Sequence, residues 1–565
     1  MPAFSRQRNE RRVSVMGTHK DGVTALKKHN VGIVSLTAIM YCACAAGAFG
    51  VEEMVSVSGP GMTIVMLLVF PLIWSVPFCL AVAELGAVMP EEGGAYVWVK
   101  KSLGEFWGFI SAFLLAISFY VANAVYIVLS IGYLSYFVEL TVFQAFCLKI
   151  ILVAVFTVIN LFGIQEVGKL STFLTIVVIA AFTLVTIVGF ANWNQNPMQP
   201  FMPEDSGVVE SIGGCAAICI WMYFGYISLP NIAGEVENPQ LIPKAVIISL
   251  PLVTITYVLP TVAGLASVGE WQSWTTDGSS GVGFSTVLTE YIGPFMGIVF
   301  CLVAIASQLA IFNSQLATGS RGFFVLADDN LCPKFLRKVS KKKGVPYVSV
   351  LLYTAVTLVL MEFEFTALVL LEVTFGLVTY ILVCIALVKM RKLYPVEKRA
   401  GMFVIPGGKA GLYYCALLPI IVCAVVLLIN GTDYFTGGIL MIPAAAVFYI
   451  IFKWIYGGLY KTDPDMYPVN SKTRLAKGDT GRLGAFCLIV GIYSLISVPF
   501  LNWYEGDWGH EYYLETYGSG MLSDFEGMLD ILLWYGAAMA AAGIILLVLW
   551  RKFDPSDKTR QLYVK

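Results

Sequence analysis

Charge is the property in which this sequence is poorest. Only 13% of its 565 residues are Asp, Glu, Lys or Arg, whereas 58% are hydrophobic. A soluble domain carries about 25% charged residues and roughly 45–50% apolar ones. This chain therefore has too few charges to cover a water-soluble globule, which excludes a soluble enzyme and a nucleic-acid-binding protein.

Histidine is scarce, and cysteine is missing from the predicted outer loops. The three histidines all lie outside the apolar segments, which excludes a histidine proton relay: His19, His29 and His510. With none of the twelve cysteines in an outer loop, we expect no disulfide framework. The pairs Cys42/Cys44 and Cys215/Cys219 have no His or carboxylate cluster at ligand spacing, so we expect neither a metal nor another cofactor.

Long apolar runs are abundant instead. A membrane-spanning helix needs about 20 predominantly apolar residues, and fourteen such segments predict an all-α polytopic membrane protein rather than a single-pass receptor. The predicted spans are 31–51, 61–89, 104–137, 143–163, 169–191, 208–230, 243–268, 290–325, 346–363, 366–390, 411–430, 437–457, 484–501 and 528–550.

The basic residues occur in alternate loops. If the N-terminus is cytoplasmic, clusters such as Lys100–Lys101 and Lys338–Lys343 fall inside, and the intervening loops hold no Lys or Arg. Lys149, near the outer part of the fourth span, is the one exception among 36 basic residues. By the positive-inside rule, the pattern predicts an integral protein of the plasma or cytoplasmic membrane with both termini in the cytoplasm.

The first and sixth spans are interrupted by glycine, within Gly47–Glu53 and Trp221–Pro230. Freed backbone groups in a membrane helix are tolerated where they face a cavity. A separation of five helices is the spacing expected of an inverted repeat, whose broken helices point at a substrate. The alternative interpretation is that these glycines only let neighbouring helices pack closely.

A series of different short motifs is distributed over the first ten spans. They are Gly47–Glu53 continuing to Gly59-Pro60, Phe70–Pro77, Ala83–Leu85, Pro90–Trp98, Gly104–Gly108, Asn160–Gly163, Ala233–Gln240, Ser320-Arg321 and Asp328–Asn330. Together they resemble the amino acid–polyamine–organocation (APC) superfamily, in its polyamine/amino-acid proton symporter branch. The resemblance hardly extends to the last two spans.

The resemblance implies a LeuT-type fold, a 5+5 inverted repeat with additional C-terminal helices, which works by alternating access. Together with the predicted spans it divides the chain into a few parts. These are a cytoplasmic tail (1–30), a transport core (31–390), spans eleven and twelve (391–460), a cytoplasmic linker (461–483), two extra spans (484–550) and a second cytoplasmic tail (551–565).

Three glutamates within or near the spans are candidates for proton coupling or for binding a substrate amine. A carboxylate in a membrane helix is costly unless it pairs, takes up a proton or meets a cationic ligand. Glu52 lies at the first break, although Glu52 and Glu53 can also simply mark the outer end of the span. Glu84 is either a gate or proton group, or a residue that locks helix ends through a nearby Arg or Lys. Glu372, in span ten, matches a glutamate of plant-type polyamine symporters.

Eight residues at the two breaks are predicted to line a substrate pocket: Gly47, Ala48, Phe49, Gly50, Trp221, Phe224, Gly225 and Tyr226. Trp221 matches a gating tryptophan of related amino-acid carriers, and an aromatic wall suits an aliphatic or cationic substrate. Ordinary aromatic packing is the alternative. Polyamine symporters carry an Asp at the position of Ile227, so its absence here favours an amino acid or a monoamine.

The expected coupling ion is the proton, through one of the three glutamates. Related proton-coupled carriers replace a sodium site with a Lys that this chain lacks near Val178. Span eight is polar but forms no convincing sodium site; its polar residues are Ser307, Gln308, Asn313 and Ser314.

The sequence thus predicts a secondary carrier, not an enzyme, that imports an amino acid or amine with protons. An obligate exchanger is the alternative, and a transporter-like nutrient sensor ranks third because segments 1–30 and 460–482 are too short for a signalling domain. Expected partners are the small-molecule substrate, protons and the lipid membrane, without nucleic acid; the oligomeric state stays open. Asn430-Gly-Thr432 fits a glycosylation sequon, and the aromatic segment 503–517 is a candidate lid or partner surface.

Overall fold

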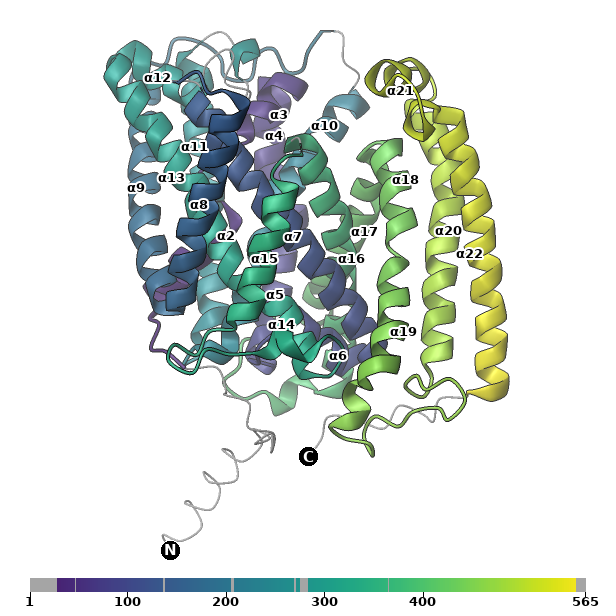
Figure 1. Ribbon diagram of the computed structural model, residues 1–565. Helices are drawn as coiled ribbons and strands as arrows, with labels where there is room; N and C mark the ends of the chain where they lie inside the picture. Colours follow the sequence, from purple (N-terminus) through teal and green to yellow (C-terminus); the bar gives the residue numbers. More distant parts are fainter. Residues whose placement is uncertain are drawn as a thin grey trace, which may run out of the picture.

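The computed structural model describes residues 28–45, 47–135, 138–204, 208–268, 271–274, 283–363 and 365–554. In these ranges every regular element is a helix, and the helices form one bundle (Figure 1). The α-helices are α2 (Ile33–Cys44), α3 (Val51–Ser58), α4 (Pro60–Phe70), α5 (Val76–Val88), α6 (Ala95–Leu103), α7 (Glu105–Ser135), α8 (Val142–Phe162), α9 (Ile164–Ala191), α10 (Val208–Met222), α11 (Leu241–Ser267), α12 (Gly283–Tyr291), α13 (Pro294–Gly319), α14 (Arg321–Asp328), α15 (Tyr347–Leu360), α16 (Phe365–Leu393), α17 (Gly408–Ile429), α18 (Thr432–Met441), α19 (Ala444–Tyr456), α20 (Asp479–Glu505), α21 (Gly509–Tyr517) and α22 (Phe525–Phe553).

Twelve helical stretches in the described ranges are long and apolar enough to cross a membrane. The chain is therefore an integral, multi-pass membrane protein. The other two predicted spans coincide with the shorter apolar helices α2 and α15. With 14 residues, α15 is about 21 Å long, less than a hydrocarbon core of about 30 Å. The count of fourteen stays a prediction.

The first predicted break separates α2 from α3. Gly47 has a φ of 119° and Gly50 a φ of 97°, values that residues with a Cβ rarely adopt. A Cβ on Gly50 would also lie 2.7 Å from Cζ3 of Trp221. Glycine at these positions therefore ends α2 and lets the chain turn into α3.

The sixth predicted span is broken as well. After α10 the chain continues as two short 3₁₀ helices, η2 (Gly225–Ile227) and η3 (Leu229–Glu235). A Cβ on Gly225 would lie 2.1 Å from the carbonyl oxygen of Ala43, the residue before the last of α2. The backbones of the two broken spans are therefore in direct contact at Gly225. Only glycine permits this contact, because any other residue would place a Cβ there.

The long helices α7 and α16 occupy the centre of the bundle. They pack against each other, and α7 also packs against α13. The peripheral helices α8, α9 and α22 instead present apolar side chains outward, such as Ile151, Phe173 and Ile545, each more than half exposed. Outward apolar faces of this extent fit a surrounding lipid phase rather than water.

The helices α20 and α22 stand side by side at one edge of the bundle, at the yellow end of the chain (Figure 1). Facing glycines bring them close together: a Cβ on Gly491 would lie 2.7 Å from the carbonyl oxygen of Gly536, and one on Gly484 would lie 3.0 Å from that of Gly543. Small residues are the usual means by which membrane helices approach closely. The last two spans are thus a tightly packed helical hairpin.

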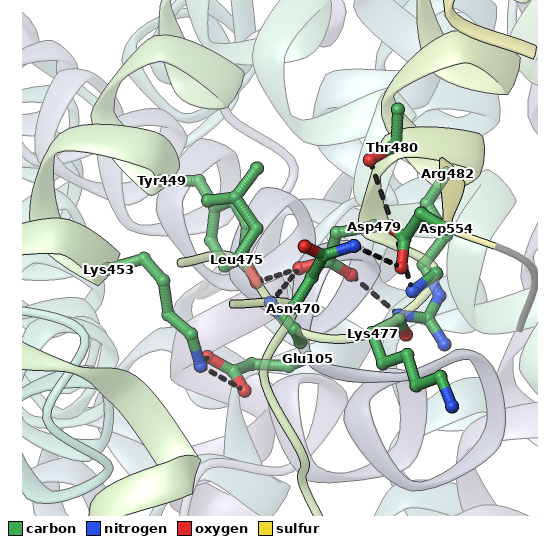
Figure 2. Close-up of polar contacts among 12 residues, drawn as sticks. Glu105, Tyr449, Lys453, Asn470, Leu475, Lys477, Asp479, Thr480, Arg482 and Asp554 are labelled. Atoms are coloured by element: carbon green, nitrogen blue, oxygen red, sulfur yellow. Dashed lines mark hydrogen bonds and ion pairs between the residues drawn. The ribbon is translucent and has the colours of Figure 1, made fainter. Parts of the chain in front are cut away.

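A polar cluster ties this hairpin to the rest of the bundle (Figure 2). At the start of α20, Asp479 accepts hydrogen bonds from the Tyr449 hydroxyl of α19 and from Nη1 of Arg482, the latter at 2.6 Å. Asp554, directly after α22, accepts one from the backbone N–H of Gly478 at 3.0 Å. The cluster therefore joins the start of α20 to α19, and the end of α22 to the start of α20.

A buried ion pair lies beside this cluster (Figure 2). Nζ of Lys453 in α19 donates to both carboxylate oxygens of Glu105, at 2.6 and 2.9 Å, and both side chains are almost fully buried. Glu105 is the first residue of α7, so the pair connects the central helix of the bundle to the helices that follow the core.

Candidate functional site

The two broken helices expose carbonyl groups at their facing ends, and side chains from other helices bind them. Four hydrogen bonds of this kind connect Tyr257 with Met222 (2.8 Å), Tyr380 with Phe224, Trp74 with Tyr223 (3.3 Å) and Gln315 with Ala43 (3.0 Å). The sequence analysis did not select these four donors. The sequence did mark three of them, Tyr257, Tyr380 and Gln315, because each is a polar side chain within an apolar span.

Glu52 lies in the first turn of α3 and is fully buried. Its Oε2 accepts a hydrogen bond from the backbone N–H of Gly50 at 3.1 Å, at the positive end of the helix dipole. Its Oε1 has no hydrogen-bond partner within the described part of the chain, and no Lys or Arg there pairs with this carboxylate. Among the described residues, the buried Glu52 carboxylate therefore has no cationic partner.

Trp221 connects two of the candidate acids. Its indole interacts with the side chain of Glu372 and stacks on Tyr126, with the ring centroids 6.3 Å apart. The same indole lies against Gly50, which donates its N–H to Glu52. The structure thus brings together four residues that the sequence analysis selected from spans one, six and ten.

Glu372 is also buried, at 1% exposure. The hydroxyl of Ser118 in α7 donates to its backbone carbonyl at 2.9 Å, which fixes this turn of α16 against α7. In the described ranges its Oε2 has no hydrogen-bond partner and no Lys or Arg pairs with it. The site therefore holds two buried acids that have no Lys or Arg counter-ion in the described part of the chain, beside a wall of aromatic rings.

The predicted pocket residues of the first span lie in an aromatic cage. The ring of Phe49 contacts those of Tyr133 and Phe182, with centroids 5.5 and 5.0 Å apart. A Cβ on Gly47 would lie 2.5 Å from the Phe182 ring, and Ala48 is fully buried. This part of the first break is apolar.

The predicted pocket residues of the sixth span pack towards α16. The ring of Phe224 lies 4.5 Å from that of Tyr380, and the next residues in the chain, Gly225, Tyr226 and Ile227, are buried. The hydroxyl of Tyr226 has no hydrogen-bond partner within the described residues. This side of the site therefore offers a polar atom besides its aromatic faces.

Glu84 lies in a different environment from the other two candidate acids. Its carboxylate accepts hydrogen bonds from Arg391 at 2.6 and 2.8 Å and from Arg399 at 2.6 Å, and the backbone N–H of Ile405 adds one at 2.8 Å. These contacts hold the end of α5 to the end of α16 and the segment after it. This is the geometry expected if Glu84 locks helix ends together through nearby arginines. A role for Glu84 in carrying protons stays a prediction.

Another buried ion pair lies where η3 ends. Glu235 Oε1 lies 2.6 Å from Nη2 of Arg321, and the neighbouring carboxylate of Glu92 accepts a hydrogen bond from the backbone N–H of Gly234 at 2.7 Å. Burial raises the pKa of Glu92 well above its usual range, the Glu235 carboxylate raises it further, and the Arg321 guanidinium opposes both. The sequence analysis listed these residues only within motifs.

The polar residues of span eight face the neighbouring spans. The Ser314 hydroxyl lies 3.1 Å from that of Ser171, and Asn313 Oδ1 accepts a hydrogen bond from Asn160 at 3.0 Å. Val178, at the position considered for a lysine, is fully buried. Among the described residues, no group of three or more His, Cys, Asp or Glu is placed to hold a metal ion.

The acidic and aromatic segment 503–517, which the sequence predicts to lie outside, is anchored to α18. Oε2 of Glu505, at the end of α20, accepts hydrogen bonds from the Thr432 hydroxyl at 2.6 Å and the Tyr513 hydroxyl at 2.8 Å. Thr432 is fully buried and Asn430 is only 8% exposed. Glycosylation needs an accessible asparagine, so this tripeptide is not a usable sequon in this structure.

The arrangement defines a class of protein. An all-helical membrane bundle whose first and sixth spans break at one buried site matches the crystal structure of MhsT in complex with L-phenylalanine. The TM-score is 0.54 at 12% identity, over 72% of this chain and 99% of that chain. The chain therefore has a LeuT-type fold.

The family follows from the sequence comparisons. The profile described as amino acid permease matches residues 31–456. A probable polyamine transporter of Arabidopsis thaliana is 29% identical over 71% of this chain and 80% of its own length. The polyamine transporter PUT1 of Oryza sativa subsp. japonica is 28% identical over 71% and 74%, respectively. The chain belongs to the amino acid permease family, within the APC superfamily.

Proposed function

We propose that this chain is a secondary active transporter that carries an amino acid or amine across the membrane by alternating access, coupled to protons. The observation that carries the proposal is the placement of Glu52 and Glu372. Both are buried, neither pairs with a Lys or Arg in the described ranges, and Trp221 lies between them where the two helices break. A buried carboxylate is stabilised by a cation at its side, and a substrate ammonium group is such a cation.

Two further observations bear on the substrate. Aromatic rings such as those of Trp221 and Tyr126 attract ammonium groups by about 0.5–2 kcal/mol. Relatives of this chain are named as polyamine transporters, and two separate carboxylates suit a molecule with more than one amino group. Ile227 remains an argument for a simpler amine or an amino acid. We therefore propose organic amines as the substrate class, with polyamines and cationic amino acids as its first members to test.

The two acids also bear on the direction of coupling. If amine and proton compete for one carboxylate, each leaves when the other arrives, and the transporter exchanges them. If Glu52 and Glu372 act separately, one holds the ammonium group while the other holds a proton, so both cross together. The second arrangement gives both buried acids a role, whereas the first needs only one of them. We therefore propose symport. Obligate exchange of amines is the alternative.

Uptake by the purified chain in proteoliposomes tests the proposal. Labelled polyamines, cationic amino acids and neutral amino acids are offered with and without an inward proton gradient, and with and without unlabelled substrate inside. We expect uptake of an amine that the gradient stimulates. Uptake only against internal substrate would establish the exchanger, and binding without flux would contradict transport.

A variant pair tests the assignment of the acids. Glu372→Gln removes the charge in the site, and we expect it to abolish stimulation by the proton gradient. Glu362→Gln is the control, because Glu362 is 46% exposed and pairs with Lys149 at the surface. Equal gradient dependence in both variants would contradict a role for Glu372 in coupling.

A further inference from the structure

An apolar cavity of about 460 Å³ lies between the core helix α16 and the helices that follow the core. Its walls come mainly from α16, α17, α18 and α20, and its lining residues include no charged side chain. Two hydroxyls in the lining are already engaged: Thr374 donates to the backbone of Leu370 at 2.7 Å, and Tyr493 to that of Ala424 at 2.5 Å. The remaining wall is mostly aliphatic and aromatic.

Such a cavity is unsuited to water. An ordered water needs two to four polar partners, and apolar cavities of about 150 Å³ stay dry and take up small hydrocarbons. The cavity beside α16 is about three times that size and falls within the range of about 300–1,000 Å³ that is common for ligand pockets. Its occupant should therefore be a hydrocarbon.

Two lining residues mark where the cavity meets its surroundings. Ile385 of α16 is 39% exposed and Ile489 of α20 is 60% exposed, whereas Leu382 and Val490 nearby are buried. Both helices are membrane spans, so lipid hydrocarbon surrounds these exposed side chains. The occupant can therefore enter from the bilayer.

We propose that this cavity binds an acyl chain of a membrane phospholipid, between the transport core and the C-terminal helices. The acyl chain is the hydrocarbon available at highest concentration beside Ile385 and Ile489, and its single bonds let it bend among branched side chains. The proposal gives the added helices a role: with α16 they form the walls of a lipid site.

The site shares a helix with the buried acids. Thr374 and Val378 line the cavity, whereas Glu372 and Tyr380 face the two breaks. Residues two apart on a helix point to nearly opposite sides, so α16 has the lipid site on one face and the candidate substrate site on the other. The binding itself does not depend on the proposed transport function.

Photolabelling tests this proposal without any transport substrate. The purified chain is reconstituted with phosphatidylcholine that carries a diazirine at the end of one acyl chain, illuminated, digested and analysed by mass spectrometry. We expect adducts on cavity residues such as Val378 and Val490, in addition to adducts on the outer face of α22. Absence of cavity adducts while α22 is labelled would overturn the proposal.

A matched pair of variants locates the binding. Val490→Phe fills the cavity and should remove its adducts while leaving those on α22, whereas Val548→Phe on the exposed face of α22 should leave cavity labelling intact. Val378→Phe serves as the filling variant if Val490→Phe does not fold. Cavity adducts that persist in a folded filling variant would overturn the site. Preferential labelling by a diazirine sterol would overturn the acyl chain as its occupant.

Discussion

Arg321 and Glu235 form an ion pair from which water is excluded. Nη2 and Nε of the guanidinium lie 2.6 and 2.7 Å from the same carboxylate oxygen, and the two side chains are 2% and 1% exposed. Glu235 ends η3, which continues the broken sixth span, and Arg321 begins α14 directly after α13. The pair therefore connects the second break to the end of span eight.

Removal of one partner from this pair should destabilise the protein strongly. A remaining charge without its partner costs about 3–5 kcal/mol, whereas replacing both charges by apolar side chains is often tolerated. We expect Glu235→Gln to lower the melting temperature in detergent markedly, and Arg321→Met with Glu235→Leu to lower it less. A double variant as damaging as Arg321→Met alone and Glu235→Leu alone added together would contradict this coupling.

Glu92 should make stability depend on pH. Its pKa is raised in the folded protein, first by burial and then by Glu235, above the value of about 4.3 in an unfolded chain. Folding therefore favours the protonated form of Glu92. The stability that this form contributes to the folded protein is fully present below about pH 4.3, and it is lost as the pH rises through the folded-state pKa.

We therefore expect Glu92→Gln to raise the melting temperature at neutral pH and to weaken its dependence on pH. Glu91→Gln is the control, because the Glu91 side chain is 53% exposed and pairs with Lys101. Thermal unfolding of the three proteins between pH 4 and pH 8 measures the effect. Parallel pH curves for Glu92→Gln and the unchanged chain would refute it.

The contact between the two breaks should not tolerate a methyl group. Gly225→Ala places a Cβ where the carbonyl oxygen of Ala43 lies only 2.1 Å away, and overpacking of this kind costs about 1–3 kcal/mol. We expect lower thermal stability and loss of uptake. Gly437→Ala, where no atom lies within 4 Å, should change neither; a similar loss in both variants would point to a general effect of the substitution.

Glu52→Gln should impair transport without unfolding the protein. The glutamine oxygen can still accept the hydrogen bond from Gly50, but the negative charge that we assign to the substrate or proton is gone. We expect uptake in proteoliposomes to fall close to background at an unchanged melting temperature, while Glu53→Gln retains uptake. Native rates and native pH dependence in Glu52→Gln would eliminate this residue from the site.

The positions of the helix breaks could be predicted, because glycine acts locally. Gly47 and Gly50 adopt backbone angles that other residues avoid, and Gly225 lies where α10 has ended. The LeuT-type fold that the family resemblance implied, in agreement with these breaks, is confirmed. The length of span nine was less predictable: α15 is shorter than the apolar run suggested, since hydropathy alone does not mark where a helix ends.

The assembly of the site could be predicted only in part. Trp221 and Glu372 interact although they are far apart in the chain, and only the resemblance to known carriers suggested that they belong together. Tyr257, Tyr380 and Gln315 were missed because a neutral polar residue in an apolar run carries a weaker signal than a charge. Their importance depends on carbonyl groups that other helices present to them.

The sequence by itself determined that this chain enters a membrane as a bundle of helices with two breaks, because hydropathy and glycine content act within each segment. Only the tertiary structure decided which buried acids receive a cation. Glu84 and Glu235 are paired with arginines that packing brings to them, whereas Glu52 and Glu372 meet no Lys or Arg in the described ranges. Pairing depends on which helices lie side by side, and no local pattern in the sequence contains that information.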